Sequence, residues 1–282
     1  MSKLKKALEK AKQARGTDRE AVIQESESSR PNLTLHVEKR RGVHDEIHVS
    51  YSHTKVQHID PLVLKGNKVI SLFQENEMTD RISILRTQIL NKLKEIGGNS
   101  LLVTSANPSE GKTFTAINLG VSIAQELDRT VLLVDADLRK PHKHHYDFAE
   151  DFFGVDIHKG LSDYLLGQAE IPELLLNPGI EKLTILPGGK SLPNSAELLG
   201  SARMESLVFE MKNRYRNDRI IIFDSSSLLL SSDPLVFSRF VDGILLVVEA
   251  EKTAPDDLKQ VMELLKDDHI IGTVMNKAKG EL

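Results

Sequence analysis

The chain has 282 residues with 37 Lys and Arg, 41 Asp and Glu, a formal net charge of −4, and neither Cys nor Trp. The lack of cysteine excludes disulfides, thiolate zinc sites and cysteine-bound iron–sulfur clusters, and the acidic balance argues against a DNA-binding surface. Apolar runs such as Ile244–Val248 are too short to span a membrane, and Met1–Lys6 lacks the apolar stretch of a secretory signal. We therefore expect a cytoplasmic protein that binds no nucleic acid.

Residues 1–16 are predicted to form a basic amphipathic helix. Leu4, Ala7, Leu8 and Ala11 recur at helical spacing, and Lys and Arg occupy most of the other positions. Because the apolar face is narrow, it suits docking to a partner protein, or weak and reversible contact with lipid.

Residues 17–76 are predicted to be a flexible linker. The stretch Gln24–Pro31 is polar and has no hydrophobic period, as is typical of a tether. Two short alternating stretches, Leu33–Val37 and Glu46–Tyr51, are strand candidates that we expect to form only against a partner.

Residues 77–282 are predicted to form one α/β domain with a mainly parallel sheet covered by helices on both faces. A first helix, with Ile82, Leu85, Ile89 and Leu93 on one face, is expected to stop at Gly97-Gly98. Runs of Leu, Ile and Val then alternate with helical stretches, which is the pattern of parallel strands buried on both faces. The expected strands are Leu101–Thr104, Val131–Val134, Leu183–Leu186, Ile220–Phe223, Ile244–Glu249 and Ile270–Met275. The expected helices are 112–127, 161–167, 197–215, 233–241 and 255–267.

A phosphate-binding P-loop is expected directly after the first strand. Its Gly-Lys-Thr sequence opens a helix, where backbone N–H groups can surround phosphate oxygens. Gly111 allows close approach of the backbone, Lys112 neutralises the β- and γ-phosphates, and the Thr113 hydroxyl is a ligand for Mg²⁺. The residues expected to bind ATP are Asn107, Pro108, Ser109, Glu110, Gly111, Lys112, Thr113, Phe114 and Asn276.

Acidic residues follow two other strands. Asp135 and Asp137 lie just past the end of a buried strand, where α/β sheets bind ligands, and a divalent cation would offset their repulsion. A turn with capping aspartates is the alternative. Asp224 ends an apolar strand in the Walker B pattern and is expected to fix the magnesium shell. The Asn276 side chain could contact an adenine edge or cap a loop.

These motifs together resemble the bacterial tyrosine kinase (BY-kinase) family, in particular the cytoplasmic autokinases of exopolysaccharide and exosortase systems. The resemblance covers about residues 80–276 and includes Asp135–Pro141, which matches the family's second Walker motif nearly letter for letter, and Pro193–Leu199. The Lys-rich residues 2–15 also resemble the start of the exosortase-associated branch. A P-loop NTPase fold is implied, with residues 77–282 as an ATP-binding kinase domain.

The resemblance also implies an activity, partners and residue roles. The protein would be an ATP- and Mg²⁺-dependent protein-tyrosine autokinase that regulates exopolysaccharide biosynthesis, with Lys112, Asp135 and Asp137 as catalytic residues. Asp135 would accept the tyrosine proton, and Thr113, Asp137 and Asp224 would organise Mg²⁺. A membrane polysaccharide co-polymerase would recruit it to the inner face of the plasma membrane, and it could form a homo-oligomer.

Three features depart from the family pattern. No tyrosine cluster follows Asn276, which leaves Tyr51 as the best candidate for autophosphorylation. The family's oligomerisation positions, Glu and two Arg, are here Asp80, Ser83 and Arg86, so the charge pairs between subunits are incomplete. A serine run, which we expect to be flexible, replaces two prolines after Asp224.

Two other functions therefore stay open. One is an ATP-binding switch of the export machinery with little kinase activity. The more distant one is a septum-positioning or partition-type ATPase, although the lysine which those enzymes carry near the start of the P-loop is here Asn107.

Overall fold

The computed structural model describes residues 35–38, 48–51, 54–73, 77–139, 148–214 and 218–279. All of them belong to one unit of the chain, Leu35–Leu282, which follows a unit formed by Met1–Thr34. The predicted basic helix of residues 1–16 lies outside the described residues, as does most of the predicted linker before residue 54.

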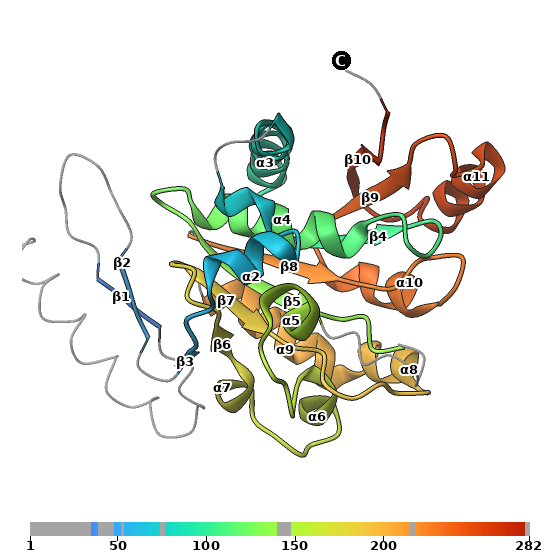
Figure 1. Cartoon of the computed structure of the whole chain (residues 1–282). Helices are drawn as coiled ribbons and strands as arrows, with labels where there is room; N and C mark the ends of the chain where they lie inside the picture. Colours follow the sequence, from blue (N-terminus) through green and yellow to red (C-terminus); the bar gives the residue numbers. More distant parts are fainter. Residues whose placement is uncertain are drawn as a thin grey trace, which may run out of the picture. The chain divides into compact units, whose positions relative to one another are not determined.

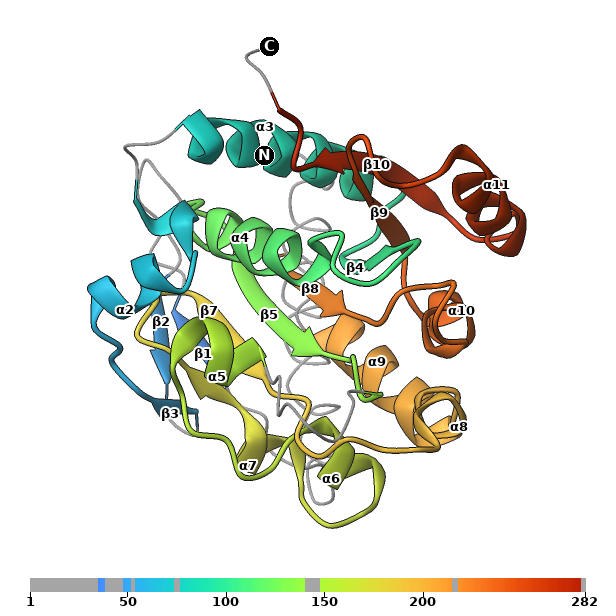
Figure 2. The ribbon, with the colours of Figure 1, turned by 45° about the vertical axis from the view of Figure 1, so that its right-hand side comes forward.

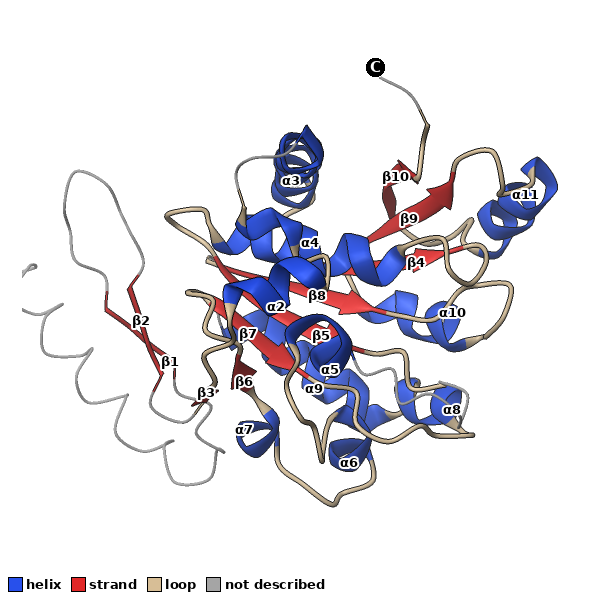
Figure 3. Ribbon diagram, viewed as in Figure 1, coloured by secondary structure: helices blue, strands red, loops and turns tan. Residues whose placement is uncertain are grey.

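Eight strands of this unit form one sheet in the order β10-β9-β4-β8-β5-β7-β6-β3 (Figure 1, Figure 3). Neighbouring strands are parallel in every pair except β6 with β7. The strands are β3 (Lys55–Val56), β4 (Ser100–Ser105), β5 (Thr130–Asp135), β6 (Leu176–Asn177), β7 (Leu183–Leu186), β8 (Arg219–Asp224), β9 (Gly243–Glu249) and β10 (Ile270–Asn276). The mainly parallel sheet and its six predicted strands are thus confirmed.

Helices cover both faces of this sheet (Figure 2). Alternate residues of a strand face opposite sides, so Ile222 of β8 joins a buried cluster with Ile117. Phe223, the next residue, instead packs edge-to-face on Phe237, with ring centroids 4.9 Å apart. The helices are α2 (Pro61–Gly66), α3 (Glu77–Glu95), α4 (Lys112–Ala124), α5 (Phe148–Phe153), α6 (Leu161–Leu165), α7 (Ile171–Leu174), α8 (Ser195–Leu199), α9 (Ala202–Arg214), α10 (Asp233–Phe237) and α11 (Pro255–Leu264). Short 3₁₀ turns are η1 (Ile70–Leu72) and η2 (Ser238–Phe240). None of the described helices is long and apolar enough to cross a lipid bilayer.

One predicted helix, 197–215, is divided into α8 and α9 at Gly200. A Cβ atom on Gly200 would lie 2.5 Å from Cγ1 of Val236 in α10, so the close approach of two helices requires glycine here. The predicted helix 233–241 similarly ends as α10 followed by η2. The other predicted helices are confirmed, with ends that differ by one to three residues.

The linker prediction is wrong for residues 54–73. Asp60 caps α2 by accepting a hydrogen bond from the Leu62 N–H, and Leu64 and Val69 are buried in the core cluster. Asn118 of α4 secures this segment by donating to the carbonyl of Lys68 and accepting from the N–H of Ser71. The segment is short and its partners are distant in sequence, so its local pattern gave no signal of packing.

The two strand candidates of the predicted linker pair with each other. Strands β1 (Leu35–Glu38) and β2 (His48–Tyr51) form an antiparallel two-stranded sheet. The expectation that they need a partner protein is therefore wrong, because the second strand of the same chain supplies the backbone hydrogen bonds.

Candidate functional site

The loop between β4 and α4 has the backbone of a phosphate cradle. Ser109 has a φ of 65° and Gly111, which precedes the first residue of α4, has a φ of 98°. A Cβ atom on Gly111 would lie 2.0 Å from Nδ2 of Asn276, so glycine is required by both conformation and space. Positive-φ residues followed by a helix N-terminus direct successive N–H groups toward one point, which is the geometry that binds an anion.

Hydrogen bonds of several side chains hold this loop in place. The buried carboxylate of Glu110 accepts hydrogen bonds from the backbone N–H of Asn107, at 3.1 Å, and from the hydroxyl of Thr253. The Asn107 amide donates to Asp257 at 2.8 Å, and the Asn276 amide donates to the carbonyl of Glu110 at 2.9 Å. Glu110 and Asn276 thus brace the loop. For Asn276 the sequence suggested a role of this kind, as a loop cap, and for Glu110 it did not.

The charged residues predicted for catalysis and metal binding come together at this loop. Asp135 and Asp224 end the adjacent strands β5 and β8 and lie opposite each other in register. The ammonium of Lys112 lies 3.8 Å from Oδ2 of Asp137, and the Thr113 side chain lies close enough to the Asp224 carboxyl to lower its pKa. Residues separated by more than 100 positions therefore share one crevice at the carboxyl edge of the sheet.

Asp224 is the most perturbed acid of this group. Complete burial raises the pKa of Asp224 from 3.8 to about 7; Lys112 opposes the increase and Asp135 adds to it. Its Oδ1 atom is buried and has no hydrogen-bond partner. A buried carboxylate with an unused oxygen beside two other acids fits a position next to a cation.

A divalent cation here would depend on more than the carboxylates. Among the described residues, no group of three or more His, Cys, Asp and Glu side chains is arranged to hold a metal ion. Mg²⁺ commonly takes one or two carboxylates and completes its shell with substrate phosphates and water. The predicted set of Thr113, Asp137 and Asp224 fits that type of site, in which the nucleotide supplies the remaining ligands.

Asp135 and Asp137 differ in their surroundings. Asp135 is fully buried and accepts hydrogen bonds from the backbone N–H groups of Asp137, at 3.0 Å, and Phe148, at 3.4 Å. A Cβ atom on Gly188 would lie 3.0 Å from Cγ of Asp135, so this loop closes over the carboxylate. The Asp137 side chain is 19% exposed, and it is the acid that faces Lys112.

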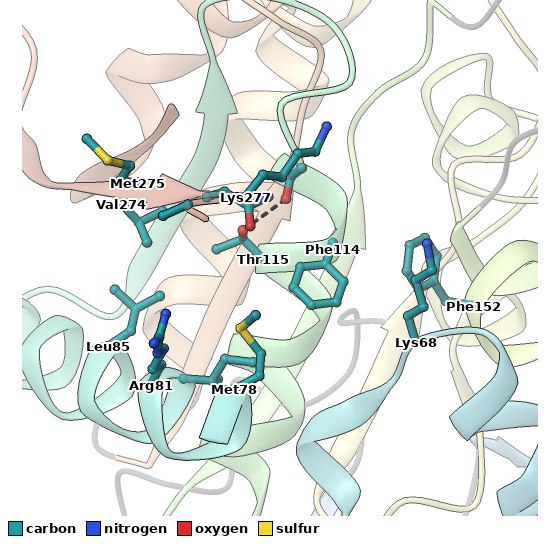
Figure 4. A pocket seen from close by; sticks show the side chains of 14 residues that line it. Lys68, Met78, Arg81, Leu85, Phe114, Thr115, Phe152, Val274, Met275 and Lys277 are labelled. Carbon is teal, nitrogen blue, oxygen red and sulfur yellow. Dashed lines mark hydrogen bonds between the residues drawn. The ribbon is translucent and has the colours of Figure 1, made fainter. Parts of the chain in front are cut away.

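An apolar cavity of about 430 Å³ opens on the other side of the loop (Figure 4). It includes Gly111 and Asn276, and Phe114 and Thr115 of α4 contribute to its wall. The sequence predicted Gly111, Phe114 and Asn276 as ATP-binding residues but did not predict the other lining residues. The further lining residues are Lys68, Met78, Arg81, Ile82, Leu85, Phe152, Val274, Met275, Lys277 and Ala278.

The serine run after Asp224 differs from the expectation of flexibility. Ser225, Ser226 and Ser227 are all buried, and the Ser225 hydroxyl donates to the carbonyl of Val103 at 3.1 Å. The expectation is wrong because hydrogen bonds to β4 fix the backbone that proline would have restricted.

Arg86 stands at one of the family's oligomerisation positions, and its side chain contacts residues of the same chain. Its guanidinium lies 2.8 Å from the Glu126 carboxylate and donates to the carbonyl of Ser122 at 3.1 Å. These bonds fasten α3 to α4, which places the side chains of α3 along the cavity.

Comparisons with known proteins identify relatives of this domain. A family model described as an AAA domain matches residues 106–276. The tyrosine-protein kinase YwqD of Bacillus subtilis (strain 168) is 33% identical over 211 residues, which are 74% of this chain and 83% of that protein. The solved kinase domain of the Escherichia coli tyrosine kinase ETK is 28% identical with a TM-score of 0.66, over 76% of this chain and 83% of that chain.

A further solved structure shares the fold alone. The septum site-determining protein MinD of Pyrococcus horikoshii OT3, solved in complex with Mg-ADP, is 24% identical with a TM-score of 0.50, over 63% of this chain and 69% of that chain. The domain therefore has a P-loop NTPase fold that kinases and other ATPases share.

Proposed function

Because the chain belongs to the bacterial tyrosine kinase family, we propose that it transfers the γ-phosphoryl group of ATP to a tyrosine hydroxyl. The observation that carries the proposal is the position of Lys112, which opens α4 beside the phosphate cradle and lies 3.8 Å from Asp137. A cation that is fixed between the cradle and an acid can hold the transferring phosphoryl group in line with an acceptor.

The acidic side of the crevice supports a magnesium-dependent reaction. Mg²⁺, when bound with ATP, would neutralise negative charge on the β- and γ-phosphates. Thr113 and Asp224, two residues of the predicted set, are proposed to hold it. The unpartnered Oδ1 of Asp224 and the raised pKa of this buried acid support this assignment, because both indicate a missing positive charge.

We favour Asp137 over Asp135 as the group that accepts the tyrosine proton. Asp135 is closed in by Gly188 and engaged by two backbone N–H groups. Asp137 is partly exposed, and an acceptor hydroxyl can reach it from solvent. Asp135 then acts as a positioning residue, since its carboxylate holds the backbone N–H of Asp137.

The nucleoside part of ATP is proposed to occupy the cavity on the other side of the loop. Phe114 immediately follows the Lys-Thr pair of the P-loop and lines this cavity, and Asn276 closes it beside Gly111. An apolar cavity with a few polar groups at its end is the usual form of such a site.

The acceptor tyrosine is proposed to lie outside the described core. Among the described side chains, the one tyrosine is Tyr164 on α6, whose ring lies 4.3 Å from the guanidinium of Arg203. Burial is the main cause that raises the pKa of Tyr164, and both features make its hydroxyl a poor acceptor. From the resemblance, the acceptor or activator belongs to an exopolysaccharide export system, with a membrane co-polymerase that recruits the kinase to the inner face of the plasma membrane.

The test uses the purified full chain with Mg·ATP and a random glutamate–tyrosine copolymer as acceptor. We expect phosphotyrosine on the copolymer with the wild type and with Lys279→Met, a matched change at an exposed lysine. Lys112→Met should give none. ATP binding without phosphotyrosine, with the copolymer or on the chain itself, would favour the switch. Steady ATP hydrolysis without phosphotyrosine would favour a partition-type ATPase.

A further inference from the structure

Lys277, which belongs to none of the sequence motifs, is held in a defined position directly after β10. Its ammonium donates to the carbonyl of Ser109 in the phosphate loop at 2.7 Å and lies 3.1 Å from Oε2 of Glu249. Hydrogen bonding from Lys277 is the main cause that holds the pKa of Glu249 below its usual range. Lys277 has a φ of 57°, an uncommon backbone conformation for a lysine.

The two anchors fix the direction of the lysine stem. Because the ammonium is bonded to the P-loop and to β9, the four methylene groups run between β10 and the loop along the border of the cavity. Figure 4 shows Lys277 on one border, near Thr115, and the α3 side chains Met78, Arg81 and Leu85 on the opposite border. Lysine commonly presents an apolar stem in this way while its charged end is bound elsewhere.

The rest of the cavity suits a flat, weakly polar ring. Phe114 contributes an aromatic face, and Met78 and Met275 contribute thioethers. A ring between Phe114 and the lysine stem would remove both surfaces from water. A larger ring covers more of these surfaces than a smaller one, so the arrangement favours a purine over a pyrimidine.

We propose that the aliphatic stem of Lys277 forms one wall of the base site and makes the site selective for purine nucleotides. This inference rests on the proposed binding of ATP. It differs from a simple bracing role, in which Lys277 would only hold the Ser109 carbonyl and would affect the phosphates of every nucleotide equally.

The experiment measures dissociation constants of the full chain with Mg²⁺ for ATP, UTP and inorganic tripolyphosphate by calorimetry. The variants are Lys277→Ala, which removes the stem, and Lys277→Met, which keeps most of it without the ammonium. Lys279→Ala, at an exposed lysine paired with Glu251, is the control. Thermal unfolding of each variant identifies any that do not fold.

We expect the wild type and Lys279→Ala to prefer ATP over UTP. Lys277→Ala should weaken the binding of ATP about tenfold, the order expected when two buried methylene groups are lost. It should weaken the binding of tripolyphosphate much less. The preference should therefore decrease in Lys277→Ala and persist in Lys277→Met. If the alanine variant does not fold, Lys277→Asn, which also lacks the long stem but suits the positive φ, should show the same decrease in preference.

Three results would overturn the inference and leave the proposed function intact: no purine preference in the wild type, an unchanged preference in Lys277→Ala, or equal losses for ATP and tripolyphosphate. If the wild type bound no ATP at all, the proposed function and this inference would both be wrong. A phosphotyrosine-positive wild type with any of the first three results would separate the two cases.

Discussion

On one side of the phosphate loop, acids from two neighbouring strands meet in a buried cluster, whereas on the other side apolar side chains from several distant segments line an open cavity. Asp137 and Asp224 represent the first region, and Phe114 and Met78 represent the second. The acids stand where charge develops during transfer, and the apolar residues contact a part of the substrate that does not react. We therefore expect substitutions in the first region to lower kcat, and those in the second to raise KM.

The largest effect should follow from Asp137→Asn. This change keeps the shape but removes the proton acceptor and the charge that faces Lys112. Formation of phosphotyrosine on the copolymer should fall about 100-fold or more, as is typical for loss of a general base. Single-turnover rates at saturating ATP measure this loss.

Asp135→Asn is the matched control for this assignment. Its amide oxygen can still accept the N–H of Asp137, so the decrease should be smaller than in Asp137→Asn. A larger decrease in Asp135→Asn, with unchanged thermal stability in both variants, would return the proton-acceptor role to Asp135.

The second effect concerns the stability of the metal-free protein as a function of pH. The pKa of Asp224 is about 7 in the folded state against an ordinary 3.8, so the folded state binds its proton more tightly than the unfolded state. The stabilisation is complete below about pH 4 and is lost as the pH rises through 7. Asp224→Asn stays neutral and should therefore unfold with a free energy about 4 kcal/mol above that of the wild type at pH 8.

Urea denaturation at pH 5 and pH 8 measures this difference, with the exposed Asp256→Asn as the control. The gain should be larger at pH 8 than at pH 5, where only part of the stabilisation has been lost. A wild type that is equally stable at both pH values would show that the Asp224 carboxylate is not destabilised by burial. The proposed electrostatic difference between the acidic cluster and the apolar cavity would then have no support.

The contrast between the regions also explains what the sequence could predict. Lys112, Thr113 and the three aspartates stand at the ends of strands or the start of a helix, and their chemistry restricts which residue types can occur there. Local patterns of this kind are visible in one sequence. The six main strands were predictable for the same reason, since most of their residues are apolar and lie in short runs between turns.

The cavity was not predictable because its residues have no common pattern. Met78 belongs to α3, Phe152 to α5 and Met275 to β10, and only tertiary packing brings them together. The packing of residues 54–73 depends in the same way on Asn118, about 50 positions away. The break at Gly200 depends on the approach of α10. Long-range contacts of this type leave no periodic signal in the segment itself.

The third effect should come from the cavity. Phe114→Ala removes an aromatic wall and should raise the KM for ATP about tenfold, since a ring contact is worth roughly 1–3 kcal/mol, with kcat within about twofold of the wild type. Initial rates at varied ATP concentration measure both constants. Phe209→Ala, at an exposed position on α9, is the control and should change neither. A decrease in kcat with unchanged KM in Phe114→Ala would mean that this side chain supports the reacting groups, and the division between the regions would fail.

The smallest effect should come from the hydrogen bond between Thr253 and Glu110, which holds the phosphate loop that lies between the two regions. The Thr253 hydroxyl donates to the buried carboxylate of Glu110, which also accepts the Asn107 N–H, so this bond helps to fix the loop beneath the phosphates. Thr253→Val keeps the shape but leaves a buried oxygen without its donor, at a cost of about 1 kcal/mol. Because every nucleotide uses this loop, ATP, UTP and tripolyphosphate should all bind about fivefold more weakly. The control is Thr87→Val, at an exposed position on α3. A loss confined to ATP would show that the brace acts on the base cavity and not on the phosphate loop.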